Sequence, residues 1–167
     1  GPTVPGTAGG NATAQTITPS TISRIDLRDS QDSLENNFAE WSLQAEETRT
    51  ISGRIFHDRN VNDRYYDDDV GLGGQRVLLS GTDISGDAMN ASVITNNDGT
   101  YAFTDLPPGV YQVTQPDQPA GLLNGTTISG IAGGQVTSID VLPSAISNID
   151  VTNVLDSANN DFAEWTI

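Results

Sequence analysis

An internal repeat of domain size is the feature that most constrains how this chain can fold. Residues 1–43 return as residues 125–167, at a constant offset of 124 positions. The match is clear where Asn37-Phe38-Ala39-Glu40-Trp41 aligns with Asp161-Phe162-Ala163-Glu164-Trp165. This period is well above the roughly 20–50 residues of solenoid repeats, so we expect a tandem array of separate domains.

The repeat also predicts where the domains lie. We expect residues 1–43 to be the C-terminal tail of a preceding repeat, and residues 44–167 to be one complete repeat. A complete repeat is long enough to bury one hydrophobic core, whereas the tail alone is too short. The tail therefore packs beside the next domain or stays mobile, or neighbouring copies of the repeat exchange edge strands through it, since an unpaired strand edge templates such pairing.

Composition excludes several classes of partner. The chain has 22 acidic and 7 basic residues, a formal charge of −15, no lysine and no cysteine. Because phosphate contacts need clustered lysine and arginine, we expect no nucleic-acid partner. Without cysteine there is no disulfide framework and no thiolate metal site. No apolar run approaches the length of a membrane span, so we expect no membrane insertion in this segment.

The apolar pattern predicts an all-β fold. Short alternating runs are separated by Gly, Asn, Asp and Pro, and no stretch keeps a helical apolar period for three turns. Asn97-Asp98-Gly99 predicts a hairpin turn, because Asp-Gly supplies the positive φ that such turns need, and Leu106-Pro107-Pro108-Gly109 predicts a second reversal. Strands at this spacing favour a β-sandwich. The predicted strands are 50–56, 75–80, 91–95, 101–104, 110–115, 138–141, 146–151 and 161–167.

The repeated aromatic segment holds candidate core residues. Its Phe and Trp stand three positions apart, so on a regular strand they point to opposite faces. We expect Phe38 and Phe162 to be core residues. Trp41 and Trp165 either cover a junction between neighbouring domains or are half-buried aromatics at a strand end.

One acidic segment carries readable chemistry. In the twelve-residue window that begins at Asp58 and ends at Asp69, side-chain oxygens stand at positions 1, 3, 5 and 12. This is the spacing by which an EF-hand-type loop surrounds a hard cation, with the carbonyl at position 7 as a further ligand. The segment therefore predicts a Ca²⁺ site. The ligands at these positions are Asp58, Asn60, Asn62, the carbonyl of Arg64, and Asp69.

Two departures from that pattern predict modest affinity. Position 6 is Asp63 where the pattern has glycine, and Asp69 at position 12 has a shorter arm than glutamate. We therefore expect a dissociation constant on the order of micromolar to millimolar. The alternative is a solvated acidic loop without metal. Three consecutive carboxylates at residues 67–69 favour the ion, because only a counter-ion makes it favourable to hold them in one compact loop.

A second acidic cluster has two interpretations. Asn96, Asn97 and Asp98 provide oxygen ligands for another cation, or they are simply the residues of a turn. Turn chemistry explains them without a metal.

Several motifs together resemble a known family, the SdrD B-like domain of bacterial surface proteins. It is a relative of the collagen-adhesin B-type (Cna-B) domains, which have a transthyretin-like sandwich. The similarity runs from about residue 50 to residue 167. The motifs are Ile51-Ser52-Gly53-Arg54-Ile55-Phe56, the acidic loop, Gly71-Leu72-Gly73-Gly74, Asn97-Asp98-Gly99-Thr100-Tyr101-Ala102-Phe103, Leu106-Pro107-Pro108-Gly109-Val110-Tyr111 and Gln118-Pro119-Ala120-Gly121.

The resemblance implies a Greek-key β-sandwich, calcium in the acidic loop, and a role as a repeated stalk in large secreted or cell-wall-attached proteins. It carries over to Asp58, Asn60, Asn62 and Asp69 as ligands, with Asp67 or Asp68 in addition. This chain has Tyr66 near position 9, where the family's usual loop has an acidic residue. The Lys–Asn isopeptide bond that locks some related domains cannot form here, because the chain has no lysine.

These features predict a structural, calcium-stabilised stalk or fibre module of a bacterial extracellular protein. The alternative is an adhesive module that grips a carbohydrate or a host protein through aromatics such as Tyr65, Tyr66 and Trp165. We do not expect an enzyme. His57, the only histidine, follows a strand directly, and acids crowded in one loop suit metal binding better than glycoside hydrolysis, which needs two carboxyls across a cleft.

Overall fold

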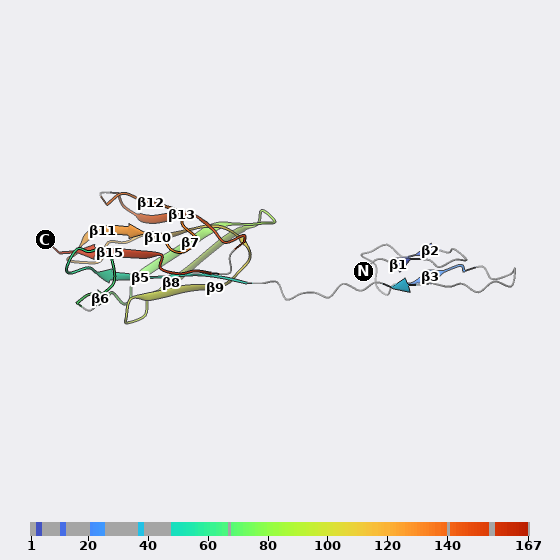
Figure 1. The fold of residues 1–167 in the computed structure, drawn as a ribbon, viewed down its shortest axis with the longest axis horizontal. Coiled ribbons are helices and arrows are strands. Elements are labelled where there is room, and N and C mark those ends of the chain that lie inside the picture. The colour runs from blue at the N-terminus through green and yellow to red at the C-terminus, as the bar shows by residue number, and fades with distance from the viewer. Residues whose placement is uncertain are drawn as a thin grey trace. The chain divides into compact units, whose positions relative to one another are not determined.

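The computed structural model describes residues 3–4, 11–12, 21–25, 37–38, 48–66, 68–139, 141–153 and 156–166. The chain divides into two compact units, Gly1–Ala45 and Glu46–Ile167, and each is described by itself (Figure 1). Every regular element in these ranges is a strand. No helix long and apolar enough to cross a bilayer occurs in the described part of the chain.

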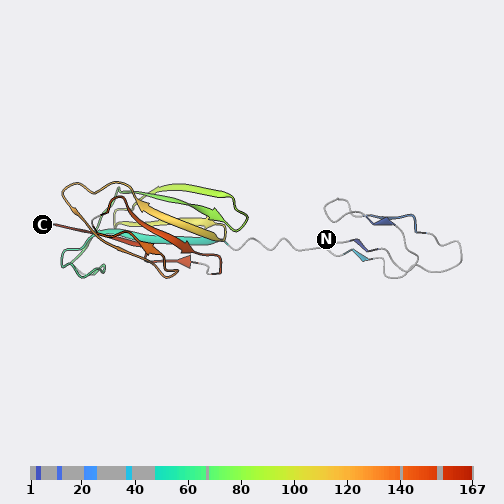
Figure 2. The same cartoon turned by 90° about the horizontal axis from the view of Figure 1, so that it is seen from above.

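The second unit is a sandwich of two sheets, which Figure 2 shows from a second direction. The first sheet has the order β12 (Gln135–Val136), β13 (Ser144–Asp150), β10 (Gly109–Gln115), β7 (Arg76–Asp83) and β8 (Ala88–Ile94). The second has the order β11 (Leu123–Ile128), β15 (Asp161–Trp165), β5 (Arg49–His57) and β14 (Asp156–Ser157), while β6 (Val70–Gly71) and β9 (Thr100–Leu106) also pair with β5. This is the expected all-β Greek-key sandwich.

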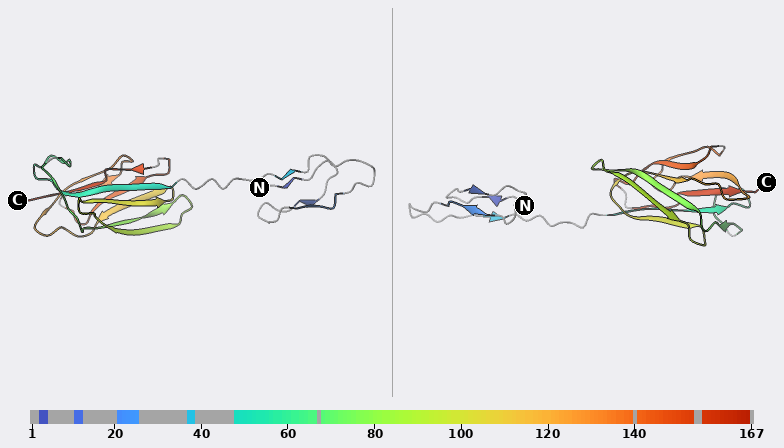
Figure 3. Two further views of the ribbon diagram at one scale, coloured as in Figure 1. Left: turned by 90° about the horizontal axis from the view of Figure 1, so that it is seen from below. Right: turned by 180° about the vertical axis from the view of Figure 1, so that it is seen from behind.

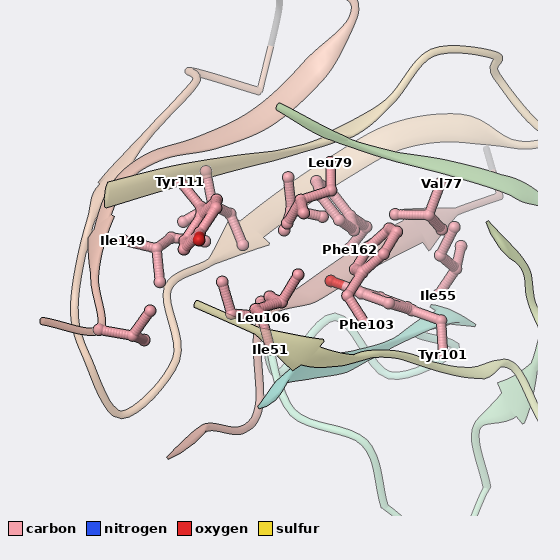
Figure 4. Close-up of a cluster of buried hydrophobic side chains, with 13 residues drawn as sticks. Ile51, Ile55, Val77, Leu79, Tyr101, Phe103, Leu106, Tyr111, Ile149 and Phe162 are labelled. Atoms are coloured by element: carbon pink, nitrogen blue, oxygen red, sulfur yellow. The ribbon is translucent and has the colours of Figure 1, made fainter. Parts of the chain in front are cut away.

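The core lies between the two sheets, where alternate residues of each strand point inward (Figure 4). On β10, for example, Tyr111 and Val113 are buried while Val110 is exposed. Phe162 is 1% exposed, so its predicted core position is confirmed. The core residues are Ile51, Ile55, Val77, Leu79, Tyr101, Phe103, Leu106, Tyr111, Val113, Ile146, Ile149, Val151 and Phe162.

The first and last long strands of this unit are direct parallel neighbours. Strand β15 pairs with β5 in the register Phe162↔Ile55 and Glu164↔His57. Strand β14 extends the parallel contact toward the start of β5. Strand β5, which begins the unit, therefore pairs with both of its last strands, β14 and β15.

The predicted strand at 138–141 is wrong. Residues 138, 139 and 141 lie outside strands, and the Val141 N–H donates to the Ser138 carbonyl at 2.9 Å, which turns the chain there. The strand of this region is the short β12. Strand β11 was not predicted, because its Asn and Gly read as turn residues. Gly125 is needed within it, since an added Cβ would lie 2.5 Å from the Ala163 carbonyl oxygen of β15.

The predicted hairpin at Asn97-Asp98-Gly99 is also wrong, although its turn chemistry is present. Gly99 has φ 82°, and its N–H donates to the Asn96 carbonyl at 2.8 Å. However, the turn joins β8, which pairs with β7, to β9, which pairs with β5. It is an arch between the sheets. The same turn packs on β5, where the Ile55 N–H donates to the Gly99 carbonyl at 3.0 Å.

The first unit contains two short ladders. Strand β1 (Thr3–Val4) pairs with β4 (Asn37–Phe38), and β2 (Asn11–Ala12) pairs with β3 (Ile22–Ser23). Both repeat the register of the second unit 124 residues later. The pair Thr3↔Phe38 corresponds to Thr127↔Phe162, and Asn11↔Ser23 corresponds to Gln135↔Ser147.

Phe38 is 51% exposed, so the expectation that it is a core residue is wrong. The segments that bury Phe162, β5 and β10 included, have no counterpart among residues 1–43 of this sequence. Trp41 and most of this tail lie outside the described residues. Packing of the tail beside the next domain and strand exchange with a neighbouring copy both stay predictions.

A buried cluster of hydrogen-bonded side chains, Glu164, Gln115 and Gln118, joins the two sheets at one end of the sandwich. Glu164 lies two residues after the core residue Phe162, so its side chain also points inward, and it is 0% exposed. Its carboxylate accepts a hydrogen bond from the Gln115 Nε2 at 2.6 Å and another from the Gln118 Nε2. Burial raises the pKa of Glu164, and the two hydrogen bonds partly oppose that rise.

Neutralising this carboxyl should stabilise the protein most at neutral pH. A group with a raised folded-state pKa contributes its stability below its unfolded pKa and loses that contribution as pH rises through the folded pKa. We therefore expect the difference in melting temperature between Glu164→Gln and the unsubstituted protein to be more positive at pH 7.5 than at pH 4. Among the described residues the carboxamide oxygens of Gln115 and Gln118 have no hydrogen-bond partner, so they can accept from the new amide.

Thermal melts followed by circular dichroism across this pH range, in a chelator, measure the difference. Asp87→Asn is the control, because this exposed carboxylate has no such burial. A difference for Glu164→Gln that does not change with pH would contradict the prediction.

Candidate functional site

The acidic loop leaves the end of β5 and returns at β6 (Figure 3). Its two ends therefore meet where β5 pairs with β6, and we call this pair of strand ends the neck. His57 and Val70 face each other across this neck in an antiparallel pair. The first loop residue is fixed to the last strand, because the Asp58 N–H donates to the Glu164 carbonyl at 2.9 Å. The loop is thus mounted where β5 and β15 end together.

Asp58 organises the first half of the loop. It is 1% exposed, and its carboxylate accepts the backbone N–H groups of Asn62 at 3.2 Å and Asp63 at 2.8 Å. Such side-chain to backbone bonds are typical of aspartate in tight turns. They fold residues 58–63 around the carboxylate and fix its orientation.

Asp69 closes the loop from the other end. It is 7% exposed, and its two carboxylate oxygens accept the N–H of Arg59 at 3.0 Å and that of Tyr66 at 2.7 Å. In return, the Asp69 N–H donates to the Tyr66 carbonyl at 2.9 Å. One side chain therefore joins the second residue of the loop to its second half.

The middle of the loop holds an unusual backbone. Val61 and Asp63 have φ values of 57° and 60°. Aspartate tolerates this left-handed region, which explains how Asp63 occupies the position where the EF-hand pattern has glycine. For a β-branched residue such as Val61 it is a true outlier, and strain of this kind costs about 1–3 kcal/mol. The hydrogen bonds to the two aspartates hold the strained segment in place.

The structure buries two of the predicted ligands and leaves the other described ones, Asn62 among them, exposed. Asp58 and Asp69 are buried, and the Asn62 Oδ1 accepts the Arg64 N–H at 2.9 Å. Within the described ranges, no three acidic or histidine side chains converge as a metal cluster. The calcium site therefore stays a prediction. Of the remaining predicted ligands, Asn60, Arg64 and Asp68 are exposed, and Asp67 lies outside the described residues.

Beneath the loop lies a small aromatic cluster that sequence reasoning missed. Phe56 is 0% exposed, yet it does not belong to the core between the sheets, because its neighbour Ile55 points there. Tyr65 of the loop packs against Phe56 edge to face, with ring centroids 5.5 Å apart. The Arg54 guanidinium lies 3.6 Å from the Tyr65 ring centroid. Two consecutive apolar residues, Ile55 and Phe56, were the available signal for a strand buried on both faces.

A groove of about 640 Å³ borders this cluster, and Asp161 is its most shielded acid. The Arg54 N–H donates to the Asp161 Oδ1 at 2.7 Å. Burial raises the pKa of Asp161, while that hydrogen bond and the charge of Arg54 oppose the rise. Tyr66 is 61% exposed at the edge of the groove, whereas the Tyr65 ring is engaged by Phe56 and Arg54. Tyr65 is nevertheless 40% exposed, so both tyrosines line the groove, whereas Trp165 is half-buried and is not among the lining residues.

Turn bonding accounts for the second acidic cluster. The Asp98 carboxylate accepts the hydroxyl of Thr100 at 2.6 Å and its N–H at 3.1 Å, and these bonds lower the pKa of Asp98. The Asn96 Nδ2 donates to the same hydroxyl at 3.0 Å. Each of these contacts lies within the turn itself.

Comparison with known proteins gives one family and a general likeness of fold. The family model described as the SdrD B-like domain matches residues 49–164. Among solved structures, the major plantain pollen allergen Pla l 1 has a TM-score of 0.42 and 10% identity, over 71% of this chain and 94% of the allergen. The full-length major pilin SpaD from Corynebacterium diphtheriae has a TM-score of 0.44 and 14% identity, over 72% of this chain and 33% of the pilin. No curated protein matches the sequence.

The bonds to Asp69 predict a loop defect that does not involve metal. In Asp69→Asn an amide NH₂ replaces one acceptor oxygen, so the N–H of Arg59 or of Tyr66 loses its partner. An unpaired buried donor costs about 1–3 kcal/mol. We expect the free energy of unfolding in chelator to fall by that amount, measured by denaturant titration. The exposed neighbour substitution Asp68→Asn should change it by less than about 0.5 kcal/mol, and equal effects of the two would contradict the assignment.

Proposed function

This chain belongs to the SdrD B-like domain family, and on that premise we propose that residues 44–167 form a calcium-stabilised stalk or fibre module of a bacterial extracellular protein. The family consists of structural modules of bacterial surface proteins, which sets the coarse role. The calcium ion, and its mechanical purpose, are the finer parts of the proposal.

Two buried carboxylates carry the case for a cation. Asp58 and Asp69 are almost fully shielded from water, and no arginine or histidine in the described part of the chain forms an ion pair with either. Burying an ionised carboxylate is unfavourable unless a positive charge compensates it. Backbone N–H groups supply part of that compensation, and a hard cation that prefers oxygen ligands would supply the rest.

The donor set fits calcium. Asp58, Asp69 and the amide oxygen of Asn62 would hold the ion, with Asn60, Asp67, Asp68 and the carbonyl of Arg64 as the further predicted ligands. A bound cation would neutralise the loop's carboxylates and tie its two halves together. An ion that binds only the folded form adds about 2.7 kcal/mol when it is present at a hundred times its dissociation constant.

The position of the loop explains why this would stiffen a stalk. The loop stands on the neck between β5 and β6, and Asp58 is bonded to β15 through the Glu164 carbonyl. Ordering the loop therefore also orders the place where the first and last long strands end. A chain with neither lysine nor cysteine has no isopeptide bond or disulfide for this task.

The adhesive alternative has less support. It needs exposed aromatic faces, but the Tyr65 ring packs on Phe56 and lies under Arg54. Tyr65 and Tyr66 are 40% and 61% exposed and both line the groove, so the aromatic surface there consists of these two adjacent rings. A structural role accounts for the buried acids and the packed Tyr65 together, which the adhesive role does not.

Removal of calcium tests the proposal. In millimolar calcium the melting temperature should exceed that in chelator by roughly 8–13 °C, which corresponds to about 2.7 kcal/mol for a domain of this size. Asp58→Ala should abolish this difference. Asp98→Asn, which alters an acidic turn elsewhere, should keep it. An unchanged midpoint of the unsubstituted protein on calcium removal would sink the proposed role of the ion.

A further inference from the structure

We propose that Tyr65 seats the acidic loop on the outer face of the sandwich and thereby positions the Asp69 carboxylate. Arg54 covers the seated ring. The seating itself does not depend on calcium, whereas its effect on cation affinity rests on the proposed function. Neither residue belongs to the predicted ligand set.

The residue on which Tyr65 packs is Phe56, a hydrophobic residue on the outer face of strand β5. Ile51 and Ile55 point from β5 into the core, so the side chain of Phe56 points outward. Its partners in the sheet are Ala163, whose methyl group is too small to cover a phenyl ring, and Gly71, which has no side chain. Phe56 is nevertheless 0% exposed, and the ring that contacts it is Tyr65 of the loop.

Tyr65 supplies that cover with a defined geometry. Its ring meets Phe56 at 5.5 Å between centroids and at 83° between planes, which is the edge-to-face arrangement that aromatic pairs prefer. On the other side, the Arg54 guanidinium lies 3.6 Å from the ring centroid, well within the range of a cation–π contact. Tyr65 is therefore held between two residues of β5.

The packing of Tyr65 also constrains Asp69, because the backbone of the next residue, Tyr66, is hydrogen-bonded to Asp69. Tyr66 follows Tyr65 directly, its N–H donates to the Asp69 Oδ2 at 2.7 Å, and its carbonyl accepts the Asp69 N–H at 2.9 Å. Fixing Tyr65 thus fixes the peptide unit that holds Asp69. The same carboxylate accepts the Arg59 N–H, so the first half of the loop is fixed with it.

Limited trypsin digestion in chelator tests the seating directly. Trypsin cuts after arginine in this lysine-free chain, and Arg59 and Arg64 are exposed loop residues. We expect Tyr65→Ala to raise the rate of cleavage after these two residues about tenfold, because the aromatic and cation–π contacts that hold the loop closed are lost. Tyr65→Phe keeps the ring and should restore the unsubstituted rate.

Tyr66→Ala is the matched control. The Tyr66 side chain is 61% exposed and makes no ring contact with the described residues, so its loss should leave cleavage unchanged. Equal acceleration in Tyr65→Ala and Tyr66→Ala would overturn the proposal, as would failure of Tyr65→Phe to restore protection. A cooperative thermal melt of Tyr65→Ala shows that the sandwich itself remains folded. Loss of that cooperative melt would also overturn the proposal, because Tyr65 would then support the core and not the loop alone.

Calcium titration by calorimetry tests the link to the ion. Tyr65→Ala should weaken calcium binding about tenfold, while Tyr65→Phe and Tyr66→Ala should match the unsubstituted protein. If the unsubstituted protein binds no calcium, the proposed function fails and the digestion result alone decides the seating. If it binds calcium and Tyr65→Ala binds equally well, the positioning of Asp69 by Tyr65 is wrong.

Discussion

Strand β5 has buried side chains on both of its faces, and this is the constraint on which the rest of the structure depends. Toward the core, Ile51 and Ile55 pack between the sheets. On the outer face, Phe56 is covered by Tyr65 of the acidic loop. Along its edges β5 pairs with β9, β14, β15 and β6. Sandwich and loop therefore share one strand, and a change in β5 acts on both.

Local patterns were enough to predict the class of fold. Alternation along residues 110–115 predicted β10 because one face of that strand is buried and the other is wet. The oxygen-bearing positions of the loop predicted Asp58 and Asp69 as calcium ligands, and that role stays a prediction. In the structure both are buried and both bind backbone N–H groups of the loop. Asn60, Asn62, Arg64 and Asp68, which lie between them, are exposed.

Long-range pairing was the part that local patterns could not predict. Asp98-Gly99 favours a tight turn in either a hairpin or an arch, and the choice depends on β5, which is more than 40 residues away and pairs with β9. Strand β11 contains Gly125 because β15 approaches it closely, and that reason is invisible without β15. Glu164 reads as a surface residue until Gln115 and Gln118 are placed beside it. Each failure involves a partner distant in sequence.

The parallel pairing of β5 with β15 has a mechanical consequence for a chain of such units. The chain enters the unit at the start of β5 and leaves it at the end of β15, and the two strands run side by side in the same direction. Tension along the chain pulls these strands past each other, so the hydrogen bonds between them are strained together and do not open one by one from an end. Such loading would act on these bonds together, in a sequence that has no cysteine for a disulfide and no lysine for an isopeptide bond.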